Sequence, residues 1–302
     1  MEGRGHAAPF FLPAPSSMPI PSFLFRAAAL ALLSMLGGCA SVLLSPAERA
    51  ESIAREAGFV VQPGGRFVRA WLKAPPGRVE ALTIYIEGDG ARWRAADVPP
   101  DDPTPENPVS LRLAVQDSAP AVAYVGRPCQ YLDDDTLNAC DPALWTRGRY
   151  SEAALKMTME VVDALVRGTG ARAVTLIGHS GGGAMAALVA EHRSDVACLA
   201  SVAAPLDIAA WTQAIKVSPL RTSLNPFDGA ARLQGVPQVH FTGARDDVVP
   251  PESIARFLRA LPQAREVRID RFDHDCCWVD EWVKLRARAC GEVPAPGSGG
   301  RP

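Results

Sequence analysis

The sequence predicts an α/β fold: a mostly parallel β-sheet with helices on both faces. Several short runs are apolar throughout, such as 81–86 (ALTIYI) and 173–177 (AVTLI), and such runs are typical of strands buried on both faces. Segments with apolar residues at helical spacing alternate with these runs, the clearest being 151–167. This alternation favours helices packed on both faces of the sheet, with a ligand crevice at the carboxyl ends of the strands.

The first half of the chain begins with a helix start at Ser45, because Ser45 can cap the helix and Glu48 completes a capping box. This helix should end near residue 57. Strands are then expected at 67–72, 81–86 and 121–125, with a helix at 109–116. We expect a Pro-rich loop at 88–108 and a long loop at 126–150.

The second half alternates more regularly. Helices are expected at 151–167, from the glycines after residue 180 to about 191, at 253–261 and at 278–289. Strands are expected at 173–177, 196–202, 237–241 and 266–269, and 204–234 should be irregular.

Composition excludes one class of function. Hydrophobic residues make up 48% of the 302 residues, which is ample for a packed core, and the formal net charge is only −2. A nucleic-acid binder usually carries a basic stripe, so we expect no nucleic-acid partner. The sequence contains neither a metal-ligand cluster nor a phosphate-binding glycine fingerprint, and we expect no metal and no cofactor.

Residues 1–38 are typical of a targeting signal. Arg26 precedes an apolar run of the length found in signal peptides, which is too short to span a bilayer. Residues 36–40 (LGGCA) resemble a bacterial lipobox, which predicts cleavage before Cys39 and lipid attachment to its thiol; an ordinary signal or an uncleaved anchor is the alternative. Met18 is an alternative start. Ala40 is not the aspartate linked to inner-membrane retention, which favours the outer membrane and periplasm of a bacterial envelope.

The expected organisation follows from these features. A lipidated N-terminus, linker and short helix should cover 39–65, the main domain 66–290, and a disordered tail 291–302.

The cysteine count suits an oxidising compartment. Seven cysteines are present, and six remain if lipid takes Cys39. Cys129 and Cys140 flank a short polar loop and are the best candidates for a disulfide. For the rest, Cys276 or Cys277 could pair with Cys290 or Cys198, and the alternative is that some cysteines are small buried apolar groups.

The sequence Gly178-His179-Ser180-Gly181-Gly182 matches the G-x-S-x-G pattern of a nucleophile elbow. A predicted strand precedes it and an Ala-rich helix follows, as such an elbow requires. Glycine neighbours avoid clashes around a strained serine, and a helix N-terminus favours developing negative charge. We predict that Ser180 is a nucleophile; a glycine-rich turn without chemistry is the alternative.

A serine needs a base, which is usually histidine. Among the five histidines, His274 follows the last predicted strand and is the predicted base, whereas His179, His192 and His240 have structural interpretations. Asp246, three residues after Gly243, is the predicted acid that orients His274, and Asp247 is its rival.

The elbow, the G-x-x-D-x-x-V-P loop at 243–250 and the late histidine resemble the α/β-hydrolase superfamily over roughly 66–290. Local motifs such as IEGDG, RPCQY and HDCCW resemble a group of uncharacterised bacterial α/β-hydrolase lipoproteins. The chain order Ser180, Asp246, His274 is the order expected of this fold. The resemblance implies a triad enzyme without indicating its substrate.

An oxyanion hole needs two backbone N–H groups. Gly181 should supply one, and the loop after 81–86 should supply the other, from Asp89 or else Gly90. Glu87 stands where the family commonly has histidine. A carboxylate there is unhelpful unless it is turned away or paired, for which Arg92, Arg127 and Arg149 are candidates.

We therefore expect an envelope-anchored serine hydrolase that cleaves an ester or related acyl bond of a small-molecule or envelope substrate, with the membrane contacted through the lipid anchor. Amidase, peptidase and thioesterase reactions use the same triad. The alternative from another class is a catalytically silent lipoprotein that acts in binding or assembly.

Overall fold

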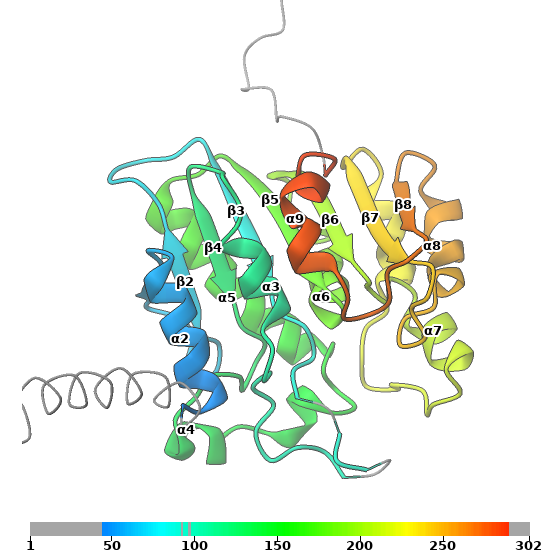
Figure 1. The fold of residues 1–302 in the computed structure, drawn as a ribbon, viewed down its shortest axis with the longest axis horizontal. Coiled ribbons are helices and arrows are strands. Elements are labelled where there is room, and N and C mark those ends of the chain that lie inside the picture. The colour runs from blue at the N-terminus through cyan, green and yellow to red at the C-terminus, as the bar shows by residue number, and fades with distance from the viewer. Residues whose placement is uncertain (1–43, 92, 96–97, 290–302) are drawn as a thin grey trace, which may run out of the picture. The chain divides into compact units, whose positions relative to one another are not determined.

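The computed structural model describes residues 44–91, 93–95 and 98–289, and in this part of the chain eight strands form one sheet in the order β1-β2-β4-β3-β5-β6-β7-β8 (Figure 1). The strands are β1 (Val60–Gln62), β2 (Ala70–Lys73), β3 (Ala81–Ile86), β4 (Val122–Val125), β5 (Ala173–His179), β6 (Val196–Val202), β7 (Gln238–Gly243) and β8 (Arg265–Ile269). β2 is antiparallel to β1 and to β4, and all other neighbours are parallel. The predicted mostly parallel sheet is confirmed.

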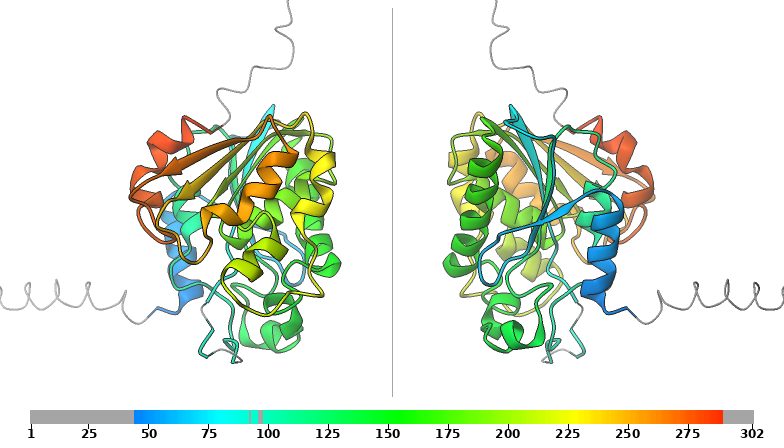
Figure 2. Two further views of the ribbon diagram at one scale, coloured as in Figure 1. Left: turned by 90° about the vertical axis from the view of Figure 1, so that its right-hand side faces the viewer. Right: turned by 90° about the vertical axis from the view of Figure 1, so that its left-hand side faces the viewer.

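Helices cover both faces of this sheet, as predicted. Within the described residues the α-helices are α2 (Pro46–Glu56), α3 (Val109–Ala114), α4 (Asp134–Asn138), α5 (Glu152–Thr169), α6 (Gly181–Ala190), α7 (Ile208–Ala214), α8 (Ala255–Ala260) and α9 (Trp278–Arg286). Figure 2 shows the sheet with α2 and α9 on one side and α5 and α6 on the other.

A separate apolar core lies on each face because successive side chains of a buried strand point to opposite sides. Tyr85 of β3 packs with α2, α3 and α9, in a cluster that includes the fully buried Trp278 and Trp282. Ile84 and Ile86 point the other way and pack with α5, α6 and α8. The two cores hold β5 in the middle of the sheet, where the predicted nucleophile follows.

The helix expected at Ser45 is confirmed with its capping box. Glu48 N–H donates to Ser45 Oγ at 3.2 Å, and Ser45 N–H donates to Glu48 Oε2 at 2.7 Å. The expected linker up to residue 65 contains the short strand β1, which pairs with β2. The predicted signal at 1–38, the lipid site Cys39 and the tail 291–302 lie outside the described residues. Among the helices that are described, none combines the length and the apolar character needed to cross a membrane.

Two segments expected to be irregular contain short helices. The segment 126–150 holds α4 and the 3₁₀ helix η2 (Pro142–Trp145), and 204–234 holds α7 and the 3₁₀ helix η3 (Pro226–Leu233). Each of these helices begins at an Asp or Asn whose side-chain oxygen accepts a backbone N–H bond; the caps are Asp133, Asp141, Asp207 and Asn225. Their apolar patterns are too short to be detected by periodicity.

The disulfide Cys129–Cys140 is confirmed, but the expected pairing of the later cysteines is wrong. Cys276 and Cys277 are bonded to each other. Cys198 lies near the amino end of β6 and is buried, whereas Cys276 and Cys277 lie in the loop after β8, so the length of a strand separates them. Cys198 is disulfide-bonded as well, and Cys290 lies outside the described residues.

Candidate active site

The turn between β5 and α6 has the strained geometry of a nucleophile elbow. Ser180 adopts φ 52° and ψ −129°, a region that residues with a side chain rarely enter. Its neighbours have no room for side chains: a Cβ at Gly178 would lie 2.2 Å from the Gly182 carbonyl carbon, and one at Gly182 would lie 2.1 Å from the Ile86 oxygen. The glycines therefore let the elbow pack tightly against the end of β3 and present Ser180 at the start of α6.

A chain of hydrogen bonds joins the three predicted triad residues. His274 Nε2 lies 3.1 Å from Ser180 Oγ, and His274 Nδ1 lies 2.9 Å from Asp246 Oδ2. The Asp246 side chain is fully buried, and its other oxygen, Oδ1, accepts N–H bonds from Val248 at 3.0 Å and Val249 at 2.7 Å. The structure thus brings together the three residues that the sequence singled out. Asp247, the rival acid, is exposed.

Two side chains whose role the sequence did not reveal hold the loop that carries His274. The carbonyl oxygen of His274 lies 3.1 Å from His179 Nε2 and accepts an N–H bond of 3.1 Å from the indole of Trp278. A carbonyl oxygen only accepts, so His179 Nε2 carries the proton. Burial, together with the neighbouring His274, lowers the pKa of His179 to about 3, so His179 stays neutral. The G-x-S-x-G pattern marks His179 only as a variable position, which is why its contact with His274 was missed.

The remaining histidines that the structure describes have no catalytic partners. His240 is fully buried in β7, where its Nδ1 lies 2.8 Å from Ser201 Oγ and its Nε2 lies 3.3 Å from Gln238 Oε1. His192 Nδ1 donates to the Leu188 carbonyl at 2.9 Å, at the end of α6. Both contacts agree with the structural interpretations of these residues.

The backbone around Ser180 offers donors for an oxyanion hole. In the described part of the chain, the N–H groups of Gly181 and Asp89 donate no hydrogen bond, whereas Gly88 N–H is occupied by Glu87 Oε1 at 2.8 Å. The Asp89 side chain lies against Gly181, because a Cβ there would be 1.9 Å from Asp89 Oδ1. Gly90 has φ 90° and faces Pro103, whose oxygen would lie 1.8 Å from a Cβ. The choice of Asp89 or Gly90 as second donor stays a prediction.

Of the two alternatives for Glu87, the structure shows the first: its carboxylate is turned away, and it does not pair with Arg127 or Arg149. Arg92 lies outside the described residues. The buried Glu87 carboxylate instead accepts hydrogen bonds from the Tyr124 hydroxyl, at 2.8 Å, and from backbone N–H groups; those groups belong to Gly88, Ser110 and Leu111. Burial raises the pKa of Glu87 despite these donors.

The two arginines pair with Asp89. Arg127 Nη1 donates to Asp89 Oδ1 at 2.9 Å, and Arg149 Nη1 donates to Oδ2 at 3.0 Å. The Tyr150 hydroxyl also donates to Oδ2, at 2.7 Å. Burial by itself raises the pKa of Asp89, but Arg149 and Arg127 outweigh it and hold this pKa below its usual value. Asp89 is therefore a carboxylate between two guanidinium groups beside the nucleophile.

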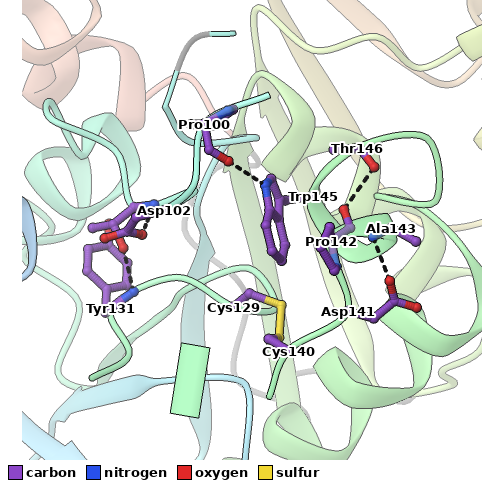
Figure 3. The surroundings of a disulfide bond; sticks show 11 residues. Pro100, Asp102, Cys129, Tyr131, Cys140, Asp141, Pro142, Ala143, Trp145 and Thr146 are labelled. Atoms are coloured by element: carbon purple, nitrogen blue, oxygen red, sulfur yellow. Dashed lines mark hydrogen bonds between the residues drawn. A yellow bond between two sulfur atoms is a disulfide. The ribbon is translucent and has the colours of Figure 1, made fainter. Parts of the chain in front are cut away.

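The segment 126–150, which carries both arginines, is fastened at several points. The Cys129–Cys140 disulfide closes part of it, and Trp145 Nε1 donates to the Pro100 carbonyl at 3.0 Å (Figure 3). Gln130 Nε2 donates to the Gly88 carbonyl at 3.0 Å, which ties the segment to the loop after β3. These contacts give the Arg127 and Arg149 side chains a defined position.

Comparison with known proteins shows which fold the chain has. Similar solved structures include a puromycin-hydrolyzing peptidase of Mycobacterium tuberculosis (TM-score 0.53, 16% identity, 77% of this chain and 40% of that chain). An acylaminoacyl peptidase of Pyrococcus horikoshii matches with TM-score 0.52 and 11% identity over 72% of this chain and 37% of that chain. Est1E from Butyrivibrio proteoclasticus matches with TM-score 0.53 and 13% identity, over 76% of this chain and 95% of its own.

The chain has the α/β-hydrolase fold, as the elbow and the order of its motifs indicated. The matched region spans less than half the length of the two peptidases. No protein-family model matches the sequence, and no curated protein matches it at a significant level.

Proposed function

We propose that this protein is a serine hydrolase in which Ser180 attacks a carbonyl carbon and His274 takes the serine proton. The observation that carries the proposal is the hydrogen-bond chain from Ser180 through His274 to Asp246, with Ser180 in a strained turn at the start of α6. Similar solved structures named as peptidases support a hydrolase.

Each group has one task in the reaction. Asp246 accepts a hydrogen bond from the Nδ1–H group of His274, which leaves Nε2 unprotonated and able to take the proton of Ser180. The oxyanion that forms is stabilised by the N–H groups of Gly181 and Asp89. His274 then donates its Nε2 proton to the leaving group, and an acyl-enzyme remains. Water, deprotonated by His274, releases the acid and restores Ser180.

The bond cleaved is an ester or a related acyl bond, and the protein acts at the bacterial envelope, anchored through lipid on Cys39. The anchor rests on the lipobox-like sequence at 36–40. Replacing Cys39 by Ser should move the protein from the membrane fraction to the soluble fraction. Continued membrane fractionation of that variant contradicts the anchor while leaving the hydrolase proposal untouched.

The test of the hydrolase proposal is labelling with a fluorophosphonate probe, which reacts only with an activated serine. Wild type should be labelled, and the Ser180→Ala and His274→Ala variants should not, with circular dichroism spectra that match wild type. A panel of ester, thioester and peptide substrates then identifies the bond. Failure to label a folded wild type contradicts the proposal and favours a binding or assembly role.

A further inference from the structure

The strands on either side of the nucleophile contribute different chemistry. The sheet order is β4-β3-β5-β6-β7-β8, and Ser180 follows β5. Asp246 and His274 follow β7 and β8, on one side of β5. Asp89 and Arg127 follow β3 and β4, on the other side. The base and the Asp89–arginine cluster therefore approach Ser180 from opposite directions along the carboxyl edge of the sheet.

This arrangement decides which part of a substrate meets the cluster. His274 has to protonate the leaving group, so the leaving group faces the side of β7 and β8. The carbonyl oxygen faces the N–H groups of Gly181 and Asp89, and the Asp89 side chain lies against Gly181. The acyl chain, rather than the leaving group, is therefore the part of the substrate that can reach Asp89 and its arginines.

The cluster carries a surplus positive charge. Asp89 is the one carboxylate within ion-pair distance of Arg127 or Arg149 among the described residues, so two cations share one anion. The nearby Glu87 is turned away and occupied by Tyr124 and backbone donors. Asp89 and its two arginines together thus have a formal charge of +1.

Arg149 is the arginine with capacity for a ligand. Its Nη1 holds Asp89 and its Nε donates to the Thr146 carbonyl at 2.7 Å, but its Nη2 donates no hydrogen bond within the described part of the chain. The Arg149 side chain is 14% exposed, whereas Arg127 is only 4% exposed and uses Nη1 and Nη2 on Asp89 and the Arg149 carbonyl. Arg149 has a fixed orientation and a donor to spare.

We propose that Arg149 binds an anionic group, such as a carboxylate, on the acyl part of the substrate. The proposal rests on the serine hydrolase function proposed above and names its substrate class. Asp89 and the Thr146 carbonyl hold the guanidinium plane, Arg127 adds positive charge behind it, and Nη2 faces the ligand. A guanidinium presents paired N–H donors that match a carboxylate, and an exposed lysine lacks this geometry.

The experiment compares two alkyl fluorophosphonate probes of equal chain length, one ending in a methyl group and one in a carboxylate. Their alkyl chain occupies the acyl position, and their reaction with Ser180 does not depend on the type of bond that the enzyme cleaves. The second-order rate constant of labelling is measured for wild type, Arg149→Gln, Arg149→Lys and Arg147→Gln. Arg147 is exposed and two residues away, so its replacement removes the same charge without touching the cluster.

Wild type should react with the carboxylate probe about tenfold faster than with the methyl probe, the size of effect expected for a hydrogen bond between charged groups. Arg149→Gln should abolish this preference, so that its rate constants with the two probes become equal, and any general slowing should affect the methyl probe less than the carboxylate probe. Arg149→Lys should restore part of the preference, and Arg147→Gln should keep all of it.

Two results overturn the proposal. One is a wild-type ratio at or below one, and the other is an Arg149→Gln variant that slows both probes equally, as a purely structural arginine would. If the methyl probe labels wild type at Ser180 in either case, the hydrolase function stands and only the substrate class fails. If neither probe labels the folded wild type, the hydrolase function fails and the substrate class with it.

Discussion

Replacing Asp246 by Asn tests whether Asp246 is the acid of the triad, because this change decides which nitrogen of His274 carries the proton. In the wild type, Asp246 Oδ1 accepts the N–H groups of Val248 and Val249, and Oδ2 faces His274 Nδ1. An asparagine must place its one carbonyl oxygen against the two backbone donors, so its NH₂ group faces His274. The imidazole then accepts at Nδ1 and carries its proton on Nε2, where it cannot take the proton of Ser180.

The expected loss follows from this forced tautomer. Holding the base in the wrong tautomer lowers kcat by roughly 10³- to 10⁴-fold, or about 4–5 kcal/mol of transition-state stabilisation. Stability should change far less, because the asparagine still satisfies both backbone donors. The assay is kcat on the best substrate from the panel, with the rate of fluorophosphonate labelling measured beside it and urea unfolding as the check on folding.

Asp247→Asn is the matched control, because it makes the same chemical change at the exposed neighbour. It should keep kcat within about twofold of wild type. If Asp246→Asn retains more than a tenth of wild-type kcat, the tautomer argument is wrong. If Asp247→Asn shows the large loss instead, the acid has been assigned to the wrong residue.

Three further outcomes are expected. Burial holds the pKa of His240 at about 3, below its unfolded value near 6.5. The contribution of His240 to the free energy of unfolding is therefore fully present above pH 6.5 and decreases as the pH falls, by about 2 kcal/mol at pH 5. His240→Gln should remove this pH dependence in urea unfolding, and the exposed His192→Gln should not. Trp278→Phe removes the indole bond to the His274 carbonyl and should slow fluorophosphonate labelling about tenfold; an unchanged rate contradicts a positioning role. Replacing Cys129 and Cys140 by Ala opens a loop with a sequence separation of 11 and should lower the free energy of unfolding by about 3 kcal/mol under oxidising conditions, whereas the same comparison in reductant should show no difference.

The sequence predicted the parts of the structure that depend on local patterns. The strand 81–86 was predicted residue for residue, and β5 with its glycine turn gave the position of Ser180, because buried parallel strands and tight turns leave strong signals. The triad was predicted because each of its members comes shortly after a predicted strand: Ser180 follows β5, Asp246 follows β7 and His274 follows β8.

The interactions between loops that are distant in the sequence could not be predicted from the sequence. Nothing in 126–150 indicates that its arginines meet Asp89 rather than Glu87, since both carboxylates belong to one short loop and the choice depends on which way each side chain points. The pairing of Cys276 with Cys277 was missed for a similar reason: the prediction assumed contacts over long distances, and the fold places the candidate partner Cys198 near the other end of a strand.

The unusual Glu87 is compatible with catalysis because the loop after β3 separates its two carboxylates. Glu87 points inward, where the N–H groups of Ser110 and Leu111 at the start of α3 and the Tyr124 hydroxyl receive it. Asp89 points to the nucleophile but is outweighed by two arginines. Arg127 and Arg149 therefore offset the negative charge that Asp89 would otherwise place beside the Gly181 N–H, where an oxyanion has to form. A site that had lost catalysis would have no need of this compensation.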